Sequence, residues 1–208
     1  MVCRSTLSIA AFFVSSAALA APAAARQVPQ FRADVSQTGD TPFTGTLYMG
    51  DAKMRFEAVL DGEPMTLIVD PAAETITMVM EQERMYMTMD VGSAPFTAPG
   101  AQSVDPANPC GGGDVTACED LGTESVNGYS ARKWAYTRDG DRETAWIATE
   151  LRFPVRILDD DGNQTDFTNV TMGAQPAALF EPPAGFTAMD MGGILGGRGR
   201  GGAGGFPG

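Results

Sequence analysis

The sequence predicts an all-β domain. Hydrophobic and polar residues alternate with a period of two over successive short segments, turn residues separate those segments, and no segment shows the ~3.6-residue period of an amphipathic helix. Successive side chains of a strand point to opposite faces of the sheet, so this alternation indicates one face against a core and one face in water. A length of 208 residues favours a single domain.

Residues 1–25 have the organisation of a secretory signal peptide. Arg4 supplies a positive charge, residues 7–20 are apolar, and small residues that suit signal peptidase end at Ala20 and at Ala25. The apolar run is shorter than the ~20 residues that a membrane-spanning helix needs, and no second apolar run follows. We therefore expect export, cleavage after about Ala20 or Ala25, and a mature protein that does not span the membrane.

The charge and composition disfavour several classes of function. Lys and Arg number 14 against 26 Asp and Glu, so the formal net charge is −12. An acidic chain disfavours nucleic acid and anionic membrane surfaces as main partners. The chain has no histidine, which is the commonest general base and metal ligand near neutral pH. We expect no catalytic residues, no cofactor and no resident metal.

Eleven strands are expected along the domain, with explicit turn signals between them. The expected strands cover residues 31–37, 43–49, 53–60, 64–70, 74–80, 84–90, 119–126, 129–137, 142–149, 153–159 and 164–172. Asp61-Gly62, Asn127-Gly128, Asp139-Gly140 and Asp161-Gly162 are dipeptides typical of tight hairpin turns. Residues 176–180 are compatible with one helical turn.

Residues 91–118 interrupt the alternation with prolines, glycines and two cysteines, and are expected to form a long loop. Cys110 and Cys118 remain as a pair once Cys3 has left with the signal peptide. Their spacing is not that of a redox or metal-binding C-x-x-C motif. A structural disulfide is therefore expected, and it would constrain the unfolded chain by roughly 2–3 kcal/mol.

The glycine-rich residues 191–208 complete the domain organisation. A composition dominated by glycine does not build a packed core, so this tail is expected to be disordered. The folded β domain is then expected to span residues 26–190.

Methionine is concentrated on the face of the expected strands that alternation marks as apolar. These residues are Met54, Met65, Met78, Met80, Met85, Met87 and Met89. Thioether side chains are flexible, so they fill irregular gaps in a core and adapt to ligands of variable shape. Three interpretations are open: an ordinary filled core, an apolar concavity that takes up a lipid-like ligand, and capture of Cu(I) by soft sulfur ligands.

Short motifs in both halves of the domain carry a family resemblance. They are Gly50–Glu57 (GDAKMRFE), Leu67–Asp70 (LIVD), Met78–Met80 (MVM), Met85–Met87 (MYM), Trp146, Leu151–Pro154 (LRFP), Asn169–Val170 and Phe180–Phe186 (FEPPAGF). Over residues 31–187 the chain resembles a family of bacterial periplasmic proteins of unknown function that is related to the LolA/LolB lipoprotein-carrier fold. The resemblance implies a periplasmic location and one curved antiparallel sheet, an open half-barrel of about ten strands with little helix.

The same resemblance implies a binding site on the concave, apolar face of that sheet. The residues implied to line it are Met54, Phe56, Met65, Leu67, Met78, Met80, Met85, Met87 and Met89. LolA-type carriers shield acyl chains beneath helices that act as a lid. This chain lacks clear amphipathic helices, so the loop 91–118 is the candidate lid.

The expected function is therefore a non-enzymatic periplasmic binding protein that holds a lipid or a lipoprotein acyl chain. One alternative is a structural or interaction protein of the cell envelope whose core is filled by its own side chains. The other alternative is Cu(I) binding through the methionines.

Overall fold

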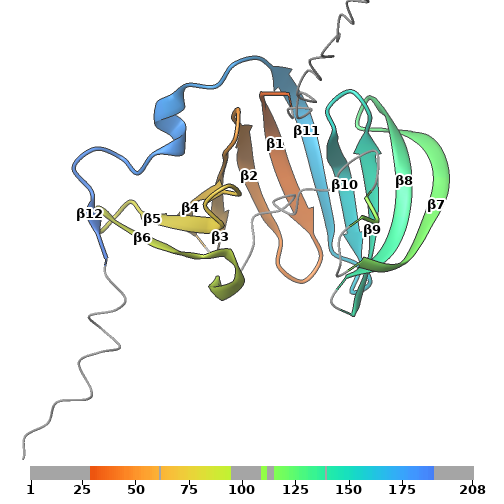
Figure 1. The fold of residues 1–208 in the computed structure, drawn as a ribbon, viewed down its shortest axis with the longest axis horizontal. Coiled ribbons are helices and arrows are strands. Elements are labelled where there is room, and N and C mark those ends of the chain that lie inside the picture. The colour runs from red at the N-terminus through yellow and green to blue at the C-terminus, as the bar shows by residue number, and fades with distance from the viewer. Residues whose placement is uncertain (1–28, 61, 95–108, 112–114, 139, 190–208) are drawn as a thin grey trace, which may run out of the picture.

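The structure, a computed structural model, describes residues 29–60, 62–94, 109–111, 115–138 and 140–189 (Figure 1). The expected signal peptide, most of the expected loop and the glycine-rich tail lie outside these residues.

All strands in the described part of the chain belong to one sheet of twelve strands. They are β1 (Phe31–Thr38), β2 (Phe43–Met49), β3 (Met54–Leu60), β4 (Glu63–Asp70), β5 (Thr75–Met80), β6 (Met85–Asp90), β7 (Val115–Val126), β8 (Tyr129–Arg138), β9 (Asp141–Ala148), β10 (Phe153–Asp159), β11 (Gln164–Met172) and β12 (Thr187–Ala188). Two short 3-10 turns accompany them, η1 (Val91–Ser93) and η2 (Ala177–Phe180). The prediction of an all-β fold with little helix is confirmed.

Strand β1 joins the two halves of the chain into this single sheet. The strand order is β12-β6-β5-β4-β3-β2-β1-β11-β10-β9-β8-β7. Strand β1 pairs with β2 on one side and with β11 on the other, both antiparallel. The N-terminal strands β1–β6 and the C-terminal strands β7–β11 are thereby continuous at the centre of the sheet (Figure 1).

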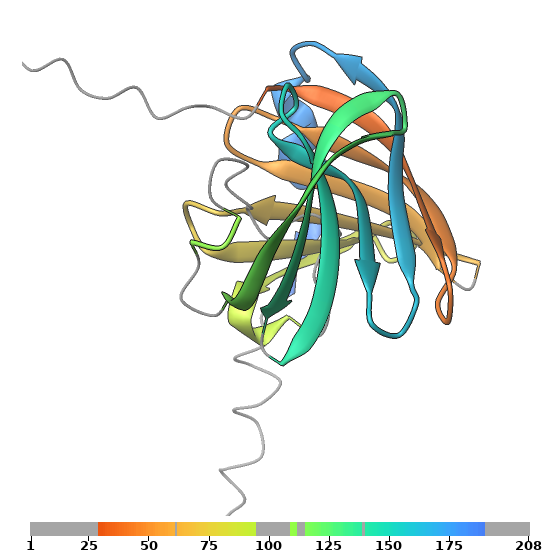
Figure 2. The ribbon, with the colours of Figure 1, turned by 90° about the vertical axis from the view of Figure 1, so that its right-hand side faces the viewer.

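The sheet is open and strongly curved, as Figures 1 and 2 show. Register shifts interrupt the β1–β11 pairing between Arg32 and Asp34, and the β10–β9 pairing between Pro154 and Arg156. A bulge of this kind bends its strand and increases the local twist. Pro154 has no backbone N–H to donate, so its place beside a bulge lets a proline lie in an interior strand. The predicted open, curved sheet is therefore confirmed.

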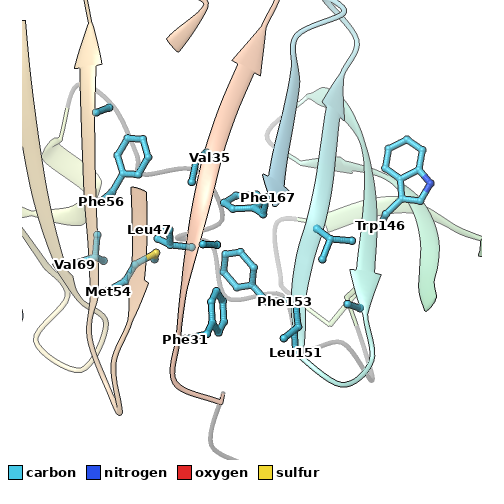
Figure 3. Packing of buried hydrophobic residues seen from close by; sticks show 14 of the residues in the cluster. Phe31, Val35, Leu47, Met54, Phe56, Val69, Trp146, Leu151, Phe153 and Phe167 are labelled. Atoms are coloured by element: carbon cyan, nitrogen blue, oxygen red, sulfur yellow. The ribbon is translucent and has the colours of Figure 1, made fainter. Parts of the chain in front are cut away.

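One hydrophobic cluster lies against both halves of the sheet (Figure 3). The Phe153 ring packs edge-on against Phe31 at 5.4 Å and against Phe167 at 5.0 Å, between ring centroids. Leu47 and Ala33 are fully buried in the same cluster. Aromatic pairs in this geometry add about 0.5–1.5 kcal/mol each beyond the area that they bury. The three rings therefore hold β1, β10 and β11 together.

The C-terminal segment, which contains η2 and β12, covers the face of β3–β6 that is opposite the first hydrophobic cluster. Phe180 of η2 packs against Ile68 and Val79 in a second cluster. A Cβ atom at Gly50 would lie 2.7 Å from the Phe180 ring, so glycine is needed there for this close approach. Strand β12 then pairs in parallel with β6 and covers that edge of the sheet.

Most expected strands lie within a residue or two of their observed positions, with two differences. Strand β7 begins at Val115, inside the segment expected to be loop, and the two-residue β12 was not expected. Strand β12 brings the sheet to twelve strands, where the alternation predicted eleven and the resemblance implied about ten. The disulfide between Cys110 and Cys118 and the helical turn at η2 are confirmed.

Truncation of Phe153 tests the role of the three-ring contact. Phe153→Ala is expected to lower the free energy of unfolding by about 3–5 kcal/mol, because it leaves a cavity between the two halves of the sheet. Phe153→Leu should cost clearly less, since it refills most of that volume. Urea denaturation measures both, with Met172→Ala as a control at an exposed position of β11. Equal effects of the Phe153→Ala and Met172→Ala changes would contradict this role.

Candidate ligand-binding face

Strand pairing places all nine predicted lining residues on one face of β3–β6. Directly opposite residues of an antiparallel pair point to the same side of the sheet. Phe56 lies opposite Leu67, and Leu67 lies opposite Met78. Met78 in turn lies opposite Met87. Alternation along each strand carries the others to this side, and we call the set the Met face: Met54, Phe56, Met65, Leu67, Met78, Met80, Met85, Met87 and Met89.

Burial decreases along the Met face from β3 towards β6. Met54 is 4% exposed and Phe56 is 1% exposed, and both lie in the large hydrophobic cluster (Figure 3). Leu67, which is also 1% exposed, belongs to the same cluster. The remaining six side chains are only half-buried: Met65, Met78, Met80, Met85, Met87 and Met89. Three of the predicted lining residues therefore serve as core, and the accessible apolar surface is formed by the six methionines of β4, β5 and β6.

One aromatic neighbour of this face was missing from the predicted set. The Phe43 ring packs edge-on against Phe56, with 5.6 Å between centroids. Phe43 opens β2 in the same alternation that buries Leu47. The period-two pattern of residues 43–49 was the signal that could have identified it.

Arg55 anchors the C-terminal segment on the other side of the same strands. Its guanidinium donates to Glu57 Oε1 at 2.6 Å and to the carbonyl of Leu179 at 3.1 Å. Together with the Phe180 cluster, these bonds close the back of β3–β5. The Met face is therefore the accessible apolar side of this end of the sheet.

A shallow pocket lies beside the Met face rather than within it. Its volume is about 370 Å³, and its walls combine polar and apolar residues of β2–β4, among them Thr46, Glu57 and Val59. Of the nine predicted lining residues, Met65 alone borders it. This pocket is therefore distinct from the concavity that the sequence predicted, and contact between the nine residues and a ligand stays a prediction.

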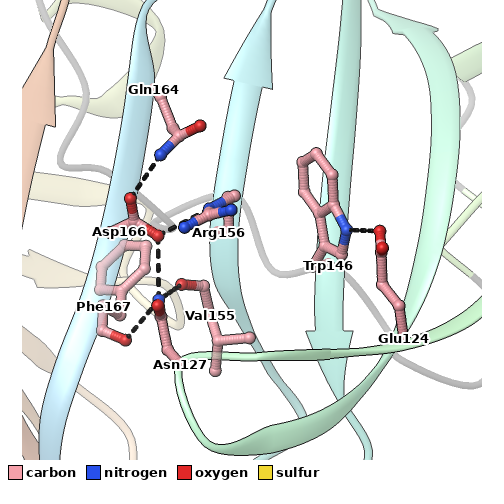
Figure 4. A network of polar contacts seen from close by, with 8 residues as sticks. All are labelled: Glu124, Asn127, Trp146, Val155, Arg156, Gln164, Asp166 and Phe167. Carbon is pink, nitrogen blue, oxygen red and sulfur yellow. Dashed lines mark hydrogen bonds and ion pairs between the residues drawn. The ribbon is translucent and has the colours of Figure 1, made fainter.

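A polar network in the C-terminal half of the sheet is centred on Asp166 of β11 (Figure 4). One carboxylate oxygen accepts from Arg156 Nε at 2.7 Å and from Asn127 Nδ2 at 2.9 Å, and the other accepts from Gln164 at 2.6 Å. Asn127 also donates to the carbonyl of Val155 at 2.8 Å. Asn127 is in the β7–β8 turn with a φ of 51°, so its side chain holds that turn against β10 and β11.

Trp146 and its neighbours continue this network. The indole Nε1 donates to Glu124, and the Lys133 ammonium lies 4.6 Å from the centre of the Trp146 ring. Lys133 also forms an ion pair with Glu124 at 3.4 Å. Both carboxylates of the network, Glu124 and Asp166, thus have cationic or N–H partners. These contacts hold β7, β8 and β9 together. Neither of the two carboxylates is left as a free acid or base.

Two further properties bear on the kind of site. Within the described ranges, no group of three or more His, Cys, Asp or Glu side chains is placed to hold a metal ion. In that same part of the chain, none of the helices has the length and hydropathy needed to cross a membrane.

Comparisons with known proteins agree with this fold. A family profile described as a domain of unknown function, DUF4412, matches residues 35–152. No curated protein matches the sequence. An uncharacterised conserved protein from Thermus thermophilus gives a TM-score of 0.55 at 12% identity, over 78% of this chain and 90% of that one.

Two other solved structures show weaker likeness. A Pseudomonas aeruginosa MucA/MucB complex gives a TM-score of 0.47 at 15% identity, over 74% of this chain and 56% of that one. The Mycobacterium tuberculosis lipoprotein LppX gives 0.39 at 15% identity, over 73% of this chain and 90% of that one. The predicted resemblance to a family of unknown function is confirmed by the family match, and the predicted single curved sheet is confirmed by the structure.

The Asp166 network predicts a specific loss of stability in acid. Burial raises the pKa of the Asp166 carboxyl, but the hydrogen bonds from Arg156, Asn127 and Gln164 outweigh burial, and the pKa lies below its ordinary value of 3.8. The folded state then binds fewer protons than the unfolded state. The stabilisation from the Asp166 carboxylate is therefore fully present above about pH 3.8. It is lost as the pH falls through the lower pKa that this group has in the folded state.

Replacement of this carboxylate tests the network. Asp166→Asn is expected to cost roughly 1.5–3 kcal/mol of unfolding free energy at pH 7, because it removes hydrogen bonds to a charged group. The deficit should shrink as the pH falls below 3.8, because the carboxyl of the unfolded wild-type chain is protonated first, and it should be smallest below the lower pKa of the folded state, where the folded wild-type carboxyl is neutral as well. Chemical denaturation across pH measures it, with Asp120→Asn at the exposed pair with Arg132 as a control that costs less. A deficit independent of pH would refute the assignment.

Proposed function

The chain belongs to the DUF4412 family, a domain of unknown function, and on that premise we propose that it is a non-enzymatic binding protein for an acyl chain. The ligand, a lipid or a lipoprotein acyl chain, lies along the methionines of β4–β6 on the Met face.

This proposal rests on the position at which the buried core ends along the Met face. Phe56 and Leu67 are each 1% exposed, whereas Met78 and Met87 in the same cross-strand row are half-buried. In the neighbouring row, Ile76 is 1% exposed and its partner Met89 is half-buried. The apolar side of the sheet thus extends beyond the part that the described side chains cover. A contiguous apolar surface of this kind typically marks a site where something binds.

The chemistry of the surface suits an alkyl chain. Its exposed members are methionines, whose unbranched side chains adapt to a flexible partner, and alternation sends the polar residues of β5 and β6 to the other side. Burial of each methylene of a ligand would contribute about 0.8 kcal/mol. Binding therefore requires no charged group on the face and no covalent step. The resemblance to LolA-type carriers agrees with this mode.

We also propose that the protein works in the periplasm, after export and removal of its N-terminal residues. The disulfide between Cys110 and Cys118 supports this location, because such bonds persist in oxidising compartments and are rare in the cytosol. The apolar run at residues 7–20 supports export.

A charge placed on the Met face tests ligand binding. Met87→Glu is expected to weaken uptake of a fluorescent fatty-acid probe by about tenfold or more, because an acyl chain would have to desolvate the carboxylate. Thr88→Glu is the matched control, since Thr88 is the next residue of β6 and is exposed on the other side of the sheet. Its uptake should match the wild type. A wild-type protein that takes up no probe, or two variants that bind alike, would dispose of the proposal.

Export is tested by the mass of the protein recovered from the periplasmic fraction. The expected mass corresponds to a chain that begins after Ala20 or after Ala25, with Cys110 and Cys118 resistant to alkylation until a reductant is added. Deletion of residues 7–20 should keep the protein in the cytoplasm. A periplasmic protein that retains Met1, or a mature chain with two free thiols, would contradict this part of the proposal.

A further inference from the structure

The methionines of the Met face form rows that cross neighbouring strands. Met80 of β5 lies opposite Met85 of β6, on either side of the β5–β6 turn. Thr66 of β4 lies opposite Val79, so continuation of this register by one residue brings Met65 of β4 opposite Met80. Met65, Met80 and Met85 therefore form one row across three adjacent strands. Neighbouring strands are about 4.8 Å apart, which lets three long side chains bring their sulfur atoms together.

A second row of methionines lies next to the first. Met78 and Met87 lie opposite each other, two residues further along β5 and β6. Five thioethers thus occupy two adjoining rows at one end of the sheet. All five are half-buried, in contrast to Met54, which is 4% exposed in the core. Part of each of these five side chains is therefore exposed to solvent.

The donor chemistry of the cluster is selective. A thioether is a neutral, soft ligand that suits Cu(I), whereas Zn²⁺, Ca²⁺ and Mg²⁺ are bound by thiolate, imidazole or oxygen donors. The chain has no histidine, and Cys110 and Cys118 are paired with each other. The cluster therefore offers donors for a soft monovalent cation and few for a hard divalent one.

We infer that the row Met65, Met80 and Met85, with Met78 and Met87 beside it, is a binding site for Cu(I). Three sulfur atoms from adjacent strands can surround one cation on the side of the sheet that the C-terminal segment leaves uncovered. The neutral ligands add no charge to the face, so the empty site remains apolar. This inference depends on sulfur, whereas the acyl-chain proposal depends on apolar area, and neither rests on the other.

The two properties are separated by leucine substitutions. Leucine matches methionine in volume and apolar character but has no sulfur. The triple variant Met65→Leu/Met80→Leu/Met85→Leu should keep the fold and the uptake of a fatty-acid probe, and should bind the cation more weakly. Met172→Leu is the matched control, because Met172 is 53% exposed on β11, away from the cluster.

Cation binding is measured with Ag(I), which replaces Cu(I) without a reductant and so leaves the disulfide intact. The Cys3→Ser protein is titrated with silver nitrate and followed by native mass spectrometry. One Ag(I) per chain is expected, and the Met172→Leu protein should bind it equally. Loss of an outer-shell partner alone typically costs 10–100-fold in metal affinity, so the triple leucine variant should bind at least about tenfold more weakly.

A second titration uses Cu(I) itself. A protein with Cys3, Cys110 and Cys118 all replaced by serine competes with a chromophoric Cu(I) chelator under anaerobic conditions, so that no thiol contributes. It is expected to withdraw one Cu(I) per chain in a manner that depends on the three methionines. The inference is overturned if the protein with the native methionines does not bind Ag(I), or if the triple leucine variant binds Ag(I) equally well. Probe uptake in that same variant decides the acyl-chain proposal separately.

Discussion

The pairing of β1 with β11 is the constraint on which the rest of the structure depends. It joins a strand from the beginning of the domain to a strand from its end, and residues such as Val35 and Phe167 meet across it. Without this ladder, the N-terminal and C-terminal sets of strands would be two separate sheets with apolar faces in water. The edge-on contacts of Phe153 with Phe31 and Phe167 lie at the same junction. Backbone pairing and aromatic packing therefore reinforce each other where the two halves of the chain meet.

The curvature of the sheet determines where its apolar side is covered. Near β1, β10 and β11, side chains from both halves meet and exclude water almost completely. Towards β6 this face is less completely covered, and Met85 and Met87 are left half-buried. The back of these strands is closed by Phe180 and by the bonds of Arg55. One continuous face thus changes from core to accessible surface without any change in its local sequence pattern.

In β7 and β8, polar contacts supply stabilisation that comes from apolar packing near the centre of the sheet. The β7–β8 turn is tied to β10 and β11 through Asn127, whose side chain satisfies backbone carbonyls and one oxygen of Asp166. Register shifts in β7 leave that strand with little alternation, and most of its residues are exposed. Side-chain hydrogen bonds therefore supply an attachment that apolar burial provides elsewhere in the sheet.

The sequence by itself determined the strands with regular alternation and the face on which the nine predicted lining residues lie, because side-chain direction in a strand depends only on parity. It placed residues 43–49, 153–159 and 164–172 as observed. It missed the start of β7, since bulges there break the period, and it missed β12, since two residues carry no pattern. Only the tertiary structure decided which methionines are core and which are accessible. Met54 and Met87 have the same local pattern, and their burial depends on whether a distant part of the chain packs over them.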